Sequence, residues 1–397
     1  MTLNSEDLSS LSQGVTSSVA KFQSTGEEND RLDALEEARH LTRVLQEPAN
    51  LIKDLFLSPT IPMAVKIASD MGIFSSLSKA TSAVTCEELA APTGADPVLV
   101  ERIMRVLTVN GFAAEQSCGR YLSTPLAKQM TERKTIGVMD SLFVDLLPAF
   151  QKTPMFLNQR KYQNPEDHRD GPFQYAYETK LSFFEWFGQN PLALARFNTF
   201  MEGTRAHLAH WAEWFPVQDR LIDEAMCDGS TPFLVDIGGG RGQDLKGLKL
   251  RYPQLPGPLV LEEMPWVIDE TQDLDSDIQK VKHDFFSPQP VKGARAYYLK
   301  YILHDYSDEN CRKILLHIVE AMKKGYSKIL IEENVIPDQN AGYTETMHDM
   351  IVMAACPGLE RTQAMWIQLF SSVGLKISKI WSPSRDSTGI IEVECQD

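Results

Sequence analysis

The sequence predicts an α/β protein in which a doubly wound, mostly parallel sheet follows a smaller, mostly helical domain. Two observations predict the sheet. From Thr231 onward, short apolar runs alternate with helical stretches, as they do where helices join parallel strands. The segment LVDIGGGRGQDL at 234–245 runs from an apolar strand into closely spaced glycines. A third observation, the order helix, helix, helix and hairpin before residue 125, predicts a winged-helix arrangement for the first domain.

The composition is that of an ordinary soluble enzyme. A chain of 397 residues usually forms two domains, and 43% hydrophobic residues can build substantial cores. The six cysteines are scattered without zinc-site spacing, so we expect no metal, no disulfides and a cytoplasmic location. The formal net charge of −15 disfavours nucleic acid as a partner. No run approaches the roughly twenty apolar residues that cross a bilayer, and no signal segment is evident, so we expect no membrane partner.

Three parts of the chain are expected: a mobile segment at 1–30, the first domain at 31–165 and the second domain at 166–397. The first segment is rich in Ser, Glu and Asp and has little periodicity. Residues 151–170 are polar and carry prolines, which predicts a loop between the domains. The stretch 173–203 is dense in Phe, Tyr and Trp. Such a stretch is more often core than ligand wall, although its position also suits a flat, aromatic substrate.

The elements of the first domain follow from apolar periodicity and capping residues. Apolar residues recur at helical spacing over 32–57, and a second helix ends around Gly72. Thr85 and Asp96 each precede an acid-rich or proline-started stretch, as helix N-caps do. The segment 112–122 then alternates loosely around a glycine, as a short hairpin does.

A winged helix also raises the possibility of a DNA-binding regulator. The helix that would read DNA, PVLVERIMRVL, carries only Arg102 and Arg105 as basic residues and is otherwise mainly apolar. Its apolar surface is therefore interpreted as core or as subunit contact, and a homodimer is expected.

Candidate residues of the second domain follow its predicted strands. Ligands of doubly wound sheets bind beyond the carboxyl ends of the strands. Gly238, Glu263, Asp284 and His304 all fall at such ends. The sequence therefore predicts that these four residues converge on one cleft.

The glycine turn favours a nucleoside cofactor without phosphates. Gly238, Gly240 and Gly242 are spaced more closely than the G-x-G-x-x-G of dinucleotide sites. Asp236 in the same turn would repel a phosphate but could accept hydrogen bonds from an ammonium group. Glycine-rich strand exits are also common as purely structural turns. Glu263, placed as a ribose-binding carboxylate, favours the cofactor, and S-adenosylmethionine meets these demands.

His304 is the candidate for catalysis. It closes an apolar run and precedes Asp305, Tyr306 and a helix-capping segment, although a lone histidine is more often structural. The spacing of His207 and His210 suits one helix face, but no carboxylate partner is evident, so metal binding is not expected.

Several ordered motifs carry a family resemblance. The order LVDIGGGRG, EEMP, HDFF, LKYILHDYSDENC, EENVIP and PGLERT resembles the small-molecule O-methyltransferases of plants and fungi, most closely the fungal secondary-metabolism members. The resemblance covers most of the chain. It implies the class I, Rossmann-like methyltransferase fold, a winged-helix dimerisation domain and S-adenosylmethionine as cofactor.

The resemblance also assigns roles to residues. It implies that the glycine turn holds the methionine part of the cofactor, that Glu263 binds ribose, and that Asp284 with Phe285 contacts adenine. Lys300 matches a lysine of the family's cofactor site. His304 matches the general base, and Glu333 and Glu360 match the acids that orient it. Many relatives carry Asp where Glu263 stands.

The chemistry explains these residue types independently. A phenol has a pKa of about 10 and a histidine one of about 6.5, so a nearby histidine can take the phenol proton as attack proceeds. Carboxylates would orient the imidazole and stabilise its cation. The acceptor would be a small aromatic or polyketide-like molecule in an apolar pocket. The predicted walls of that pocket, each of which could instead be core, are Phe187, Phe200, Met201, Met350 and Met353.

Three functions therefore stay open. The first is O-methyl transfer to a phenolic or enolic hydroxyl, which the intact base and both acids favour. The second is a non-methylating enzyme on the same scaffold, a dehydratase or pericyclase that uses the positive charge of the cofactor. The third, a DNA-binding regulator, is disfavoured by the acidic balance and the apolar helix.

Overall fold

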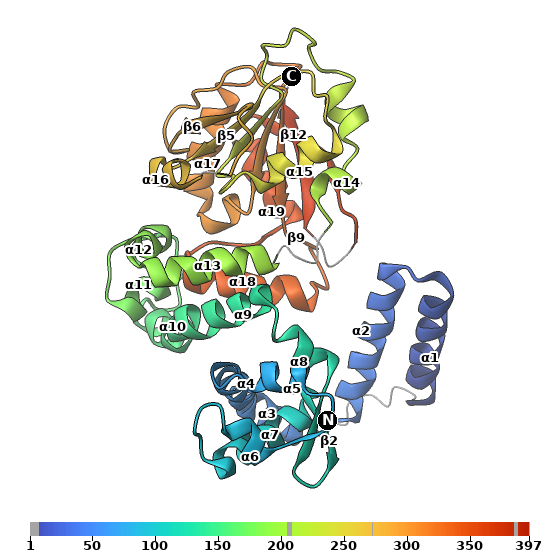
Figure 1. The fold of residues 1–397 in the computed structure, drawn as a ribbon. Helices are drawn as coiled ribbons and strands as arrows, with labels where there is room; N and C mark the ends of the chain where they lie inside the picture. Colours follow the sequence, from blue (N-terminus) through green and yellow to red (C-terminus); the bar gives the residue numbers. More distant parts are fainter. Residues whose placement is uncertain (1–7, 205–208, 272, 385–387, 397) are drawn as a thin grey trace. The chain divides into compact units, whose positions relative to one another are not determined.

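The computed structural model describes residues 8–204, 209–271, 273–384 and 388–396 (Figure 1). The chain folds into two compact units. Unit 1 comprises residues 1–144 with 192–206, and unit 2 comprises residues 145–191 with 207–397. The boundary that the sequence predicts, between residues 165 and 166, falls inside unit 2. No described helix is long and apolar enough to cross a membrane.

Unit 1 contains the winged-helix arrangement. A three-stranded sheet in the order β1-β3-β2 accompanies short helices whose apolar faces share one core. The predicted caps are present: Thr85 and Glu88 form a reciprocal capping box, and Asp96 Oδ1 accepts the Val98 N–H at 2.8 Å. The elements are α4 (Thr60–Asp70), α5 (Ile73–Lys79), β1 (Val84–Thr85), α6 (Cys86–Ala90), α7 (Pro97–Val109), β2 (Ala113–Ser117), β3 (Arg120–Ser123), α8 (Pro125–Gln129) and α9 (Arg133–Asp140).

The N-terminal helices differ from the expectation. Regular structure begins before Arg31, because α1 (Leu8–Thr25) is helical and packs along α2 (Glu28–Leu45). Leu8, Leu11, Val15 and Phe22 of α1 recur at helical spacing, but the serine-rich composition of the segment outweighed this signal, and the helix buries no residue fully. The helix expected over 32–57 is interrupted before α3 (Pro48–Leu57), since a proline lacks the N–H of a helix interior and here occupies the first helical position.

Unit 2 is built on a seven-stranded sheet in the order β11-β12-β8-β7-β4-β5-β6. Strands β4 to β8 are parallel, and β12 joins β8 and β11 in antiparallel pairs, so the predicted doubly wound, mostly parallel sheet is confirmed. The strands are β4 (Leu234–Ile237), β5 (Leu259–Glu263), β6 (Ile278–Lys282), β7 (Ala296–Lys300), β8 (Lys328–Glu333), β11 (Leu375–Trp381) and β12 (Gly389–Cys395).

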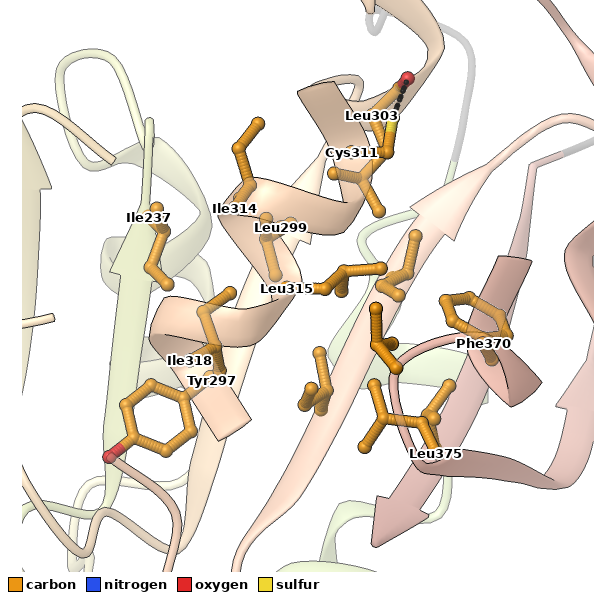
Figure 2. Packing of buried hydrophobic residues seen from close by; sticks show 14 of the residues in the cluster. Ile237, Tyr297, Leu299, Leu303, Cys311, Ile314, Leu315, Ile318, Phe370 and Leu375 are labelled. Atoms are coloured by element: carbon orange, nitrogen blue, oxygen red, sulfur yellow. Dashed lines mark hydrogen bonds between the residues drawn. The ribbon is translucent and has the colours of Figure 1, made fainter. Parts of the chain in front are cut away.

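Helices cover both faces of the sheet (Figure 1). On β7, Tyr297 and Leu299 pack on the face that α17 and α19 cover, whereas Tyr298 packs on the opposite face with Trp211. Figure 2 shows the first face, where Ile314 and Leu315 lie over the strands and the Cys311 thiol donates to the Leu303 carbonyl. The helices around the sheet are α14 (Trp211–Trp214), η2 (Gln218–Ile222), α15 (Gln243–Arg251), α16 (Pro265–Glu270), η3 (Leu303–Asp305), α17 (Asp308–Val319) and α19 (Gln363–Ser371).

Further helices of unit 2 precede the sheet or lie between β9 and β10. They are α10 (Leu147–Gln159), α11 (Pro172–Tyr177), α12 (Phe183–Gln189) and α18 (Tyr343–Ala355), and a π-helical turn η1 (Ser141–Leu146) leads into α10. The loop predicted over 151–170 is therefore wrong for its first nine positions, where the apolar side chains of α10 pack despite the internal Pro154. Helix α13 (Pro191–Thr204) lies almost entirely in unit 1, where Glu202 pairs with Arg133 at 3.0 Å.

Candidate active site

The glycine turn follows β4 and has the backbone that the sequence predicts. Gly238, Gly240 and Gly242 all have positive φ, at +70°, +60° and +73°. A side chain at residue 238 would place its Cβ 2.6 Å from Ile302 Cδ1, so only glycine fits there. Asp236, at the end of β4, is 1% exposed. The turn thus leaves room for a ligand beside the strand ends.

Glu263 is the last residue of β5 and faces the glycine turn. Its Oε1 accepts the Gly240 N–H at 3.0 Å and its Oε2 accepts the Met264 N–H at 2.8 Å. Burial raises the pKa of Glu263, and the two backbone hydrogen bonds partly offset that rise. Each oxygen retains acceptor capacity for a hydroxyl group.

Asp284 and Phe285 follow β6. Asp284 is exposed, and its Oδ1 accepts the Phe286 N–H at 3.0 Å. The Phe285 ring packs edge-on against Tyr306 with centroids 5.8 Å apart. A carboxylate and a ring face therefore lie in one turn, as adenine contact would require.

Lys300 is the last residue of β7 and is held by two carboxylates. Its Nζ lies 3.2 Å from Asp244 Oδ1 and 3.0 Å from Glu332 Oε1. Both acids are buried, and Thr388 also donates to Glu332 at 2.9 Å. These pairs give Lys300 a structural role at the sheet edge, and its direct contact with a cofactor stays a prediction.

His304 lies in the η3 turn, four residues beyond the end of β7, rather than at the end of the strand as predicted. Its Nδ1 lies 2.9 Å from Glu360 Oε1 and 3.6 Å from Glu333 Oε2. Among the described residues Nε2 makes no hydrogen bond, and it lies 3.6 Å from Asp305 Oδ1. The structure therefore brings together the histidine and both predicted acids, and one ring nitrogen is available.

Glu333, at the end of β8, orients the turn that carries His304. Its Oε1 accepts the N–H groups of Ile302 at 3.1 Å and Leu303 at 3.0 Å, with His304 at 3.4 Å. Glu333 is fully buried, and within the described chain its Oε2 has no hydrogen-bond partner. Burial raises the pKa of Glu333 to about 7.

Glu360 reaches His304 through the pairing of two short strands. Strands β9 (Val335–Ile336) and β10 (Arg361–Thr362) are parallel partners, which places Glu360 beside Asn334. The Asn334 amide donates to Glu360 Oε1 at 2.9 Å, and the Leu359 N–H donates to the His304 carbonyl at 2.7 Å. A Cβ at Gly358 would collide with that carbonyl, which explains the glycine in PGLERT.

The charges around His304 control its protonation. Burial alone would lower the pKa of His304, but Glu333, Asp305 and Glu360 together raise it well above its usual value. The same cation holds the pKa of Glu360 below its usual range despite burial. These carboxylates therefore favour the imidazolium form of His304, with Glu360 as its counterion.

One histidine nitrogen and two carboxylate oxygens from His304, Glu333 and Glu360 lie within 4.8 Å of one another, a spacing that a metal ion could also use. The hydrogen bond between Nδ1 and Glu360 occupies the nitrogen that faces the carboxylates. The expectation that the enzyme needs no metal stays a prediction.

The sequence missed several residues that support His304. Arg361 is fully buried and donates to the Leu303 carbonyl at 2.9 Å and the Tyr306 carbonyl at 2.8 Å, which fixes the η3 turn. The Glu360 N–H donates to Asp349 at 2.9 Å. Asn334 lies inside the EENVIP motif, whose polar residue after two acids was a usable signal. Arg361 gave none, because a buried arginine cannot be told from an exposed one by pattern.

The predicted acceptor walls divide between the two units. Phe187 is 1% exposed and packs against Phe173 and Trp186, so its surroundings favour the alternative that it is core. Met350 is 53% exposed on α18, and Met353 is half-buried. Phe200 and Met201 are half-buried in α13 and belong to unit 1. Their contact with an acceptor stays a prediction.

The comparison with protein families identifies the chain. The family model of the O-methyltransferase domain matches residues 166–376, and that of the O-methyltransferase dimerisation domain matches residues 54–133. The chain belongs to the O-methyltransferase family. This confirms the resemblance seen in the motifs, the class of enzyme and the use of S-adenosylmethionine as the family's cofactor.

Curated relatives are fungal enzymes of similar length. The O-methyltransferase asqD of Emericella nidulans is 37% identical over 339 residues, which are 85% of this chain and 87% of that protein. The demethylsterigmatocystin 6-O-methyltransferase of Aspergillus flavus is 34% identical over 334 residues, covering 84% of this chain and 85% of that protein. This member of the O-methyltransferase family is therefore similar to enzymes of fungal secondary metabolism.

Solved structures share the whole fold of this O-methyltransferase family member. LepI in complex with S-adenosylmethionine has a TM-score of 0.87 and 28% identity, over 99% of this chain and 100% of that one. A structure described as a pericyclic reaction enzyme has the same score and identity, over 98% of this chain and 100% of that one. OxaC in complex with sinefungin and meleagrin has a TM-score of 0.86 and 24% identity, over 98% and 99%, and shows the fold alone. The class I methyltransferase fold is confirmed.

Proposed function

We propose that this protein transfers a methyl group from S-adenosylmethionine to a phenolic or enolic hydroxyl of a small secondary metabolite, with His304 as the general base. The observation that carries the proposal is the orientation of His304. Glu360 holds Nδ1 at 2.9 Å, and Nε2 makes no hydrogen bond to any described residue. A base needs one nitrogen fixed and the other available, and this arrangement provides both.

The residues at the strand ends fit the cofactor. Gly238 leaves space that a Cβ would fill, and the carboxylate of Glu263 stands at the end of β5 with acceptor capacity for ribose hydroxyls. Asp284 and Phe285 offer an acceptor and a ring face for adenine. When bound, S-adenosylmethionine supplies an electrophilic methyl group.

The residues of the chain then position and deprotonate the acceptor. As the hydroxyl oxygen attacks, its proton passes to Nε2 of His304, which must first have lost its own proton there. Glu360 and Glu333 stabilise the imidazolium that results, so they act as positioning residues. Attack also requires the reacting atoms to lie about 3 Å apart, which the walls of the pocket must enforce.

An exposed apolar face of α18 supports an apolar acceptor. Tyr343, Met347 and Met350 are 68%, 42% and 53% exposed, and their spacing of four and three residues places them on one helix face. Asp349, on the same helix, accepts the Glu360 N–H, so α18 reaches the His304 site. An aromatic or polyketide-like molecule would bury these side chains.

A homodimer is the assembly that we propose. Helix α3 buries no residue within the described chain, and its apolar side chains at Leu51, Ile52, Leu55 and Phe56 are 41%, 58%, 66% and 77% exposed. Such a patch is unusual on a monomer. The dimerisation family model includes the end of this helix.

A second function has a specific observation in its favour. The carboxylates around His304 favour its protonated form, and an imidazolium donates a proton more readily than it accepts one. A dehydratase or pericyclase could use that donor, and a pericyclic reaction enzyme is among the similar structures at 28% identity.

The test is transfer of labelled methyl from S-adenosylmethionine into a panel of phenols, hydroxyquinones and hydroxypyridones, with His304→Ala beside the native protein. Label in a product made by the native protein alone supports methyl transfer with His304 as base. Conversion of a panel member without label, and only with cofactor present, would support the second function. Equal labelling by the variant would reject His304 as the base.

A further inference from the structure

Two buried polar residues outside the His304 site lie directly behind the cofactor residues. Glu262, on β5, is 1% exposed, and His283, which follows β6, is 9% exposed. His283 Nδ1 lies 3.0 Å from Glu262 Oε2, and the Gln289 amide donates to the same oxygen at 2.7 Å. Neither residue has a part in the proposed transfer.

Both nitrogens of the His283 ring face oxygen acceptors. Nδ1 faces the Glu262 carboxylate, and Nε2 lies 3.4 Å from the Ser287 carbonyl. Only the imidazolium can donate from both nitrogens. A neutral ring would turn one nitrogen lone pair toward an oxygen lone pair. The geometry therefore selects the protonated form.

The pair joins the two segments that present the adenosine residues. Glu262 precedes Glu263, and His283 precedes Asp284. The His283 N–H donates to the Glu263 carbonyl at 2.9 Å, and the Glu262 carbonyl accepts the Gly238 N–H at 2.8 Å. Backbone hydrogen bonds of Glu262 and His283 thus link the glycine turn, the ribose carboxylate and the adenine turn, and the ion pair joins the side chains of these two residues.

Loss of the positive charge would leave Glu262 in an unfavourable position. Its Oε1 is buried and has no hydrogen-bond partner among the described residues. A buried carboxylate that loses its cation is strongly destabilised unless the surroundings move. The surroundings here are the cofactor-binding turns themselves.

We propose that the protonated His283–Glu262 pair is a positioning device that sets the spacing of the adenosine site and makes cofactor affinity depend on pH. The proposal rests on the cofactor site of the proposed function. The His283–Glu262 pair is proposed to affect binding of the nucleoside part of the cofactor, whereas His304 is proposed to deprotonate the methyl acceptor.

The direction of the pH dependence follows from the charges that face His283. Burial would lower the pKa of His283, but the hydrogen bond and charge of Glu262, with Asp284, raise it above its usual value. Burial also raises the pKa of the Tyr297 phenol, which interacts with Glu262, to about 12, so that group stays neutral. From α17, His317 approaches the Phe286 carbonyl rather than His283. Because the protonated pair holds the binding turns in place, affinity is highest below the pKa of His283 and falls as pH rises through that value.

The test is calorimetric binding of S-adenosylhomocysteine to the full-length protein between pH 6 and 9. This ligand has no sulfonium charge, so its affinity reports less on the His304 cation. We expect the native Kd to rise several-fold across this range. His283→Gln should have a Kd about tenfold higher at pH 6, roughly 1.4 kcal/mol, and a flat profile. His40→Gln in α2 is the matched control and should follow the native curve.

Steady-state kinetics distinguish a positioning role of His283 from a general loss of structure. For His283→Gln, KM for S-adenosylmethionine should rise about as much as the Kd while kcat at saturation stays within about twofold, because uniform binding alone is lost. If this variant does not fold, Glu262→Gln replaces it. Glu262→Gln keeps a carbonyl oxygen that can accept the His283 hydrogen bond but removes the negative charge. It should make the Kd for S-adenosylhomocysteine equally independent of pH.

The outcomes are distinct. A native protein that binds no S-adenosylhomocysteine at any pH would reject the proposed function itself. Binding by a folded His283→Gln or Glu262→Gln with the native affinity and the native pH profile would overturn the positioning role alone. A raised Kd with an unchanged pH slope would also overturn it, since a purely structural loss would behave in that way.

Discussion

Two histidines, His283 buried and His304 half-buried, lie near the ends of strands of the same sheet, and each has a glutamate at Nδ1. His304, after β7, meets Glu360 at 2.9 Å, and His283, after β6, meets Glu262 at 3.0 Å. They differ at the other nitrogen. Nε2 of His283 faces a carbonyl within the protein, whereas Nε2 of His304 makes no hydrogen bond to a described residue.

The comparison shows which feature separates His304, the proposed general base, from His283, the proposed positioning residue. A carboxylate at Nδ1 raises the pKa of both histidines above the usual value, so the shift alone does not identify the catalytic group. The nitrogen without a hydrogen bond to a described residue is what marks His304 as the proposed base, because a bound molecule could exchange a proton only there. Each experiment below either separates the two histidines or shows that this distinction is wrong.

The largest effect is expected for His304→Ala. Removal of a general base should lower kcat by roughly 10²- to 10⁴-fold while the Kd for S-adenosylhomocysteine stays within about twofold. His283→Gln should give the reverse, a raised Kd and a nearly native kcat. Steady-state turnover and calorimetry on both variants make the measurement. Equal loss of affinity in both would show that the two sites act as one.

The next effect is expected for Glu360→Gln. The amide still orients the ring but removes a negative charge, so kcat should fall about tenfold, less than for loss of the base itself. The pKa of His304 should also fall. Native activity should rise with pH and reach half its maximum above pH 6.5, and the midpoint for the variant should lie lower.

The free energy of unfolding should depend on pH over the same range in which His304 titrates. Because the folded pKa of His304 is raised, its pair with Glu360 stabilises the fold fully below the unfolded pKa, about 6.5, and this contribution is lost as pH rises through the folded value. Thermal melts of native protein and Glu360→Gln should therefore converge at alkaline pH. A constant difference between them would contradict the ion pair.

The two histidines also show which parts of the site can be predicted from the sequence and which cannot. His304 could be named because it follows a predicted strand of a parallel sheet, and Glu333 and Glu360 because their motifs resemble those of the family. His283 and Glu262 lie inside equally clear motifs, but their contact depends on register and side-chain direction between β5 and β6. Arg361 gave no signal, since a buried charge cannot be told from an exposed one by pattern. Helix α1 was missed although its apolar residues recur at helical spacing, because the segment is rich in serine. Pattern therefore predicts the sheet and the residues that meet at its edge, but not the polar contacts behind them.

A smaller effect is expected at the glycine turn that both regions share. Gly238 has φ of +70°, and a Cβ there would approach Ile302, two residues before His304, at 2.6 Å. Gly238→Ala should raise the Kd for S-adenosylhomocysteine about tenfold with little change in the pKa that governs turnover. Gly293→Ala is the matched control, since it has φ of +67° and open space around it. A native Kd for Gly238→Ala would show that the turn adapts without cost.

The smallest effect is expected for removal of metal ions. Atoms of His304, Glu333 and Glu360 lie close enough to hold a cation, and the deprotonated histidine that a base requires is also the form that a metal would bind. A metal would need the Nδ1 lone pair, which the hydrogen bond to Glu360 replaces with a donated proton. Treatment with EDTA should therefore change kcat by less than about twofold. Loss of activity that Mg²⁺ or Zn²⁺ restores would contradict a metal-free base and would make Nδ1 of His304 a metal ligand instead of a hydrogen-bond donor to Glu360.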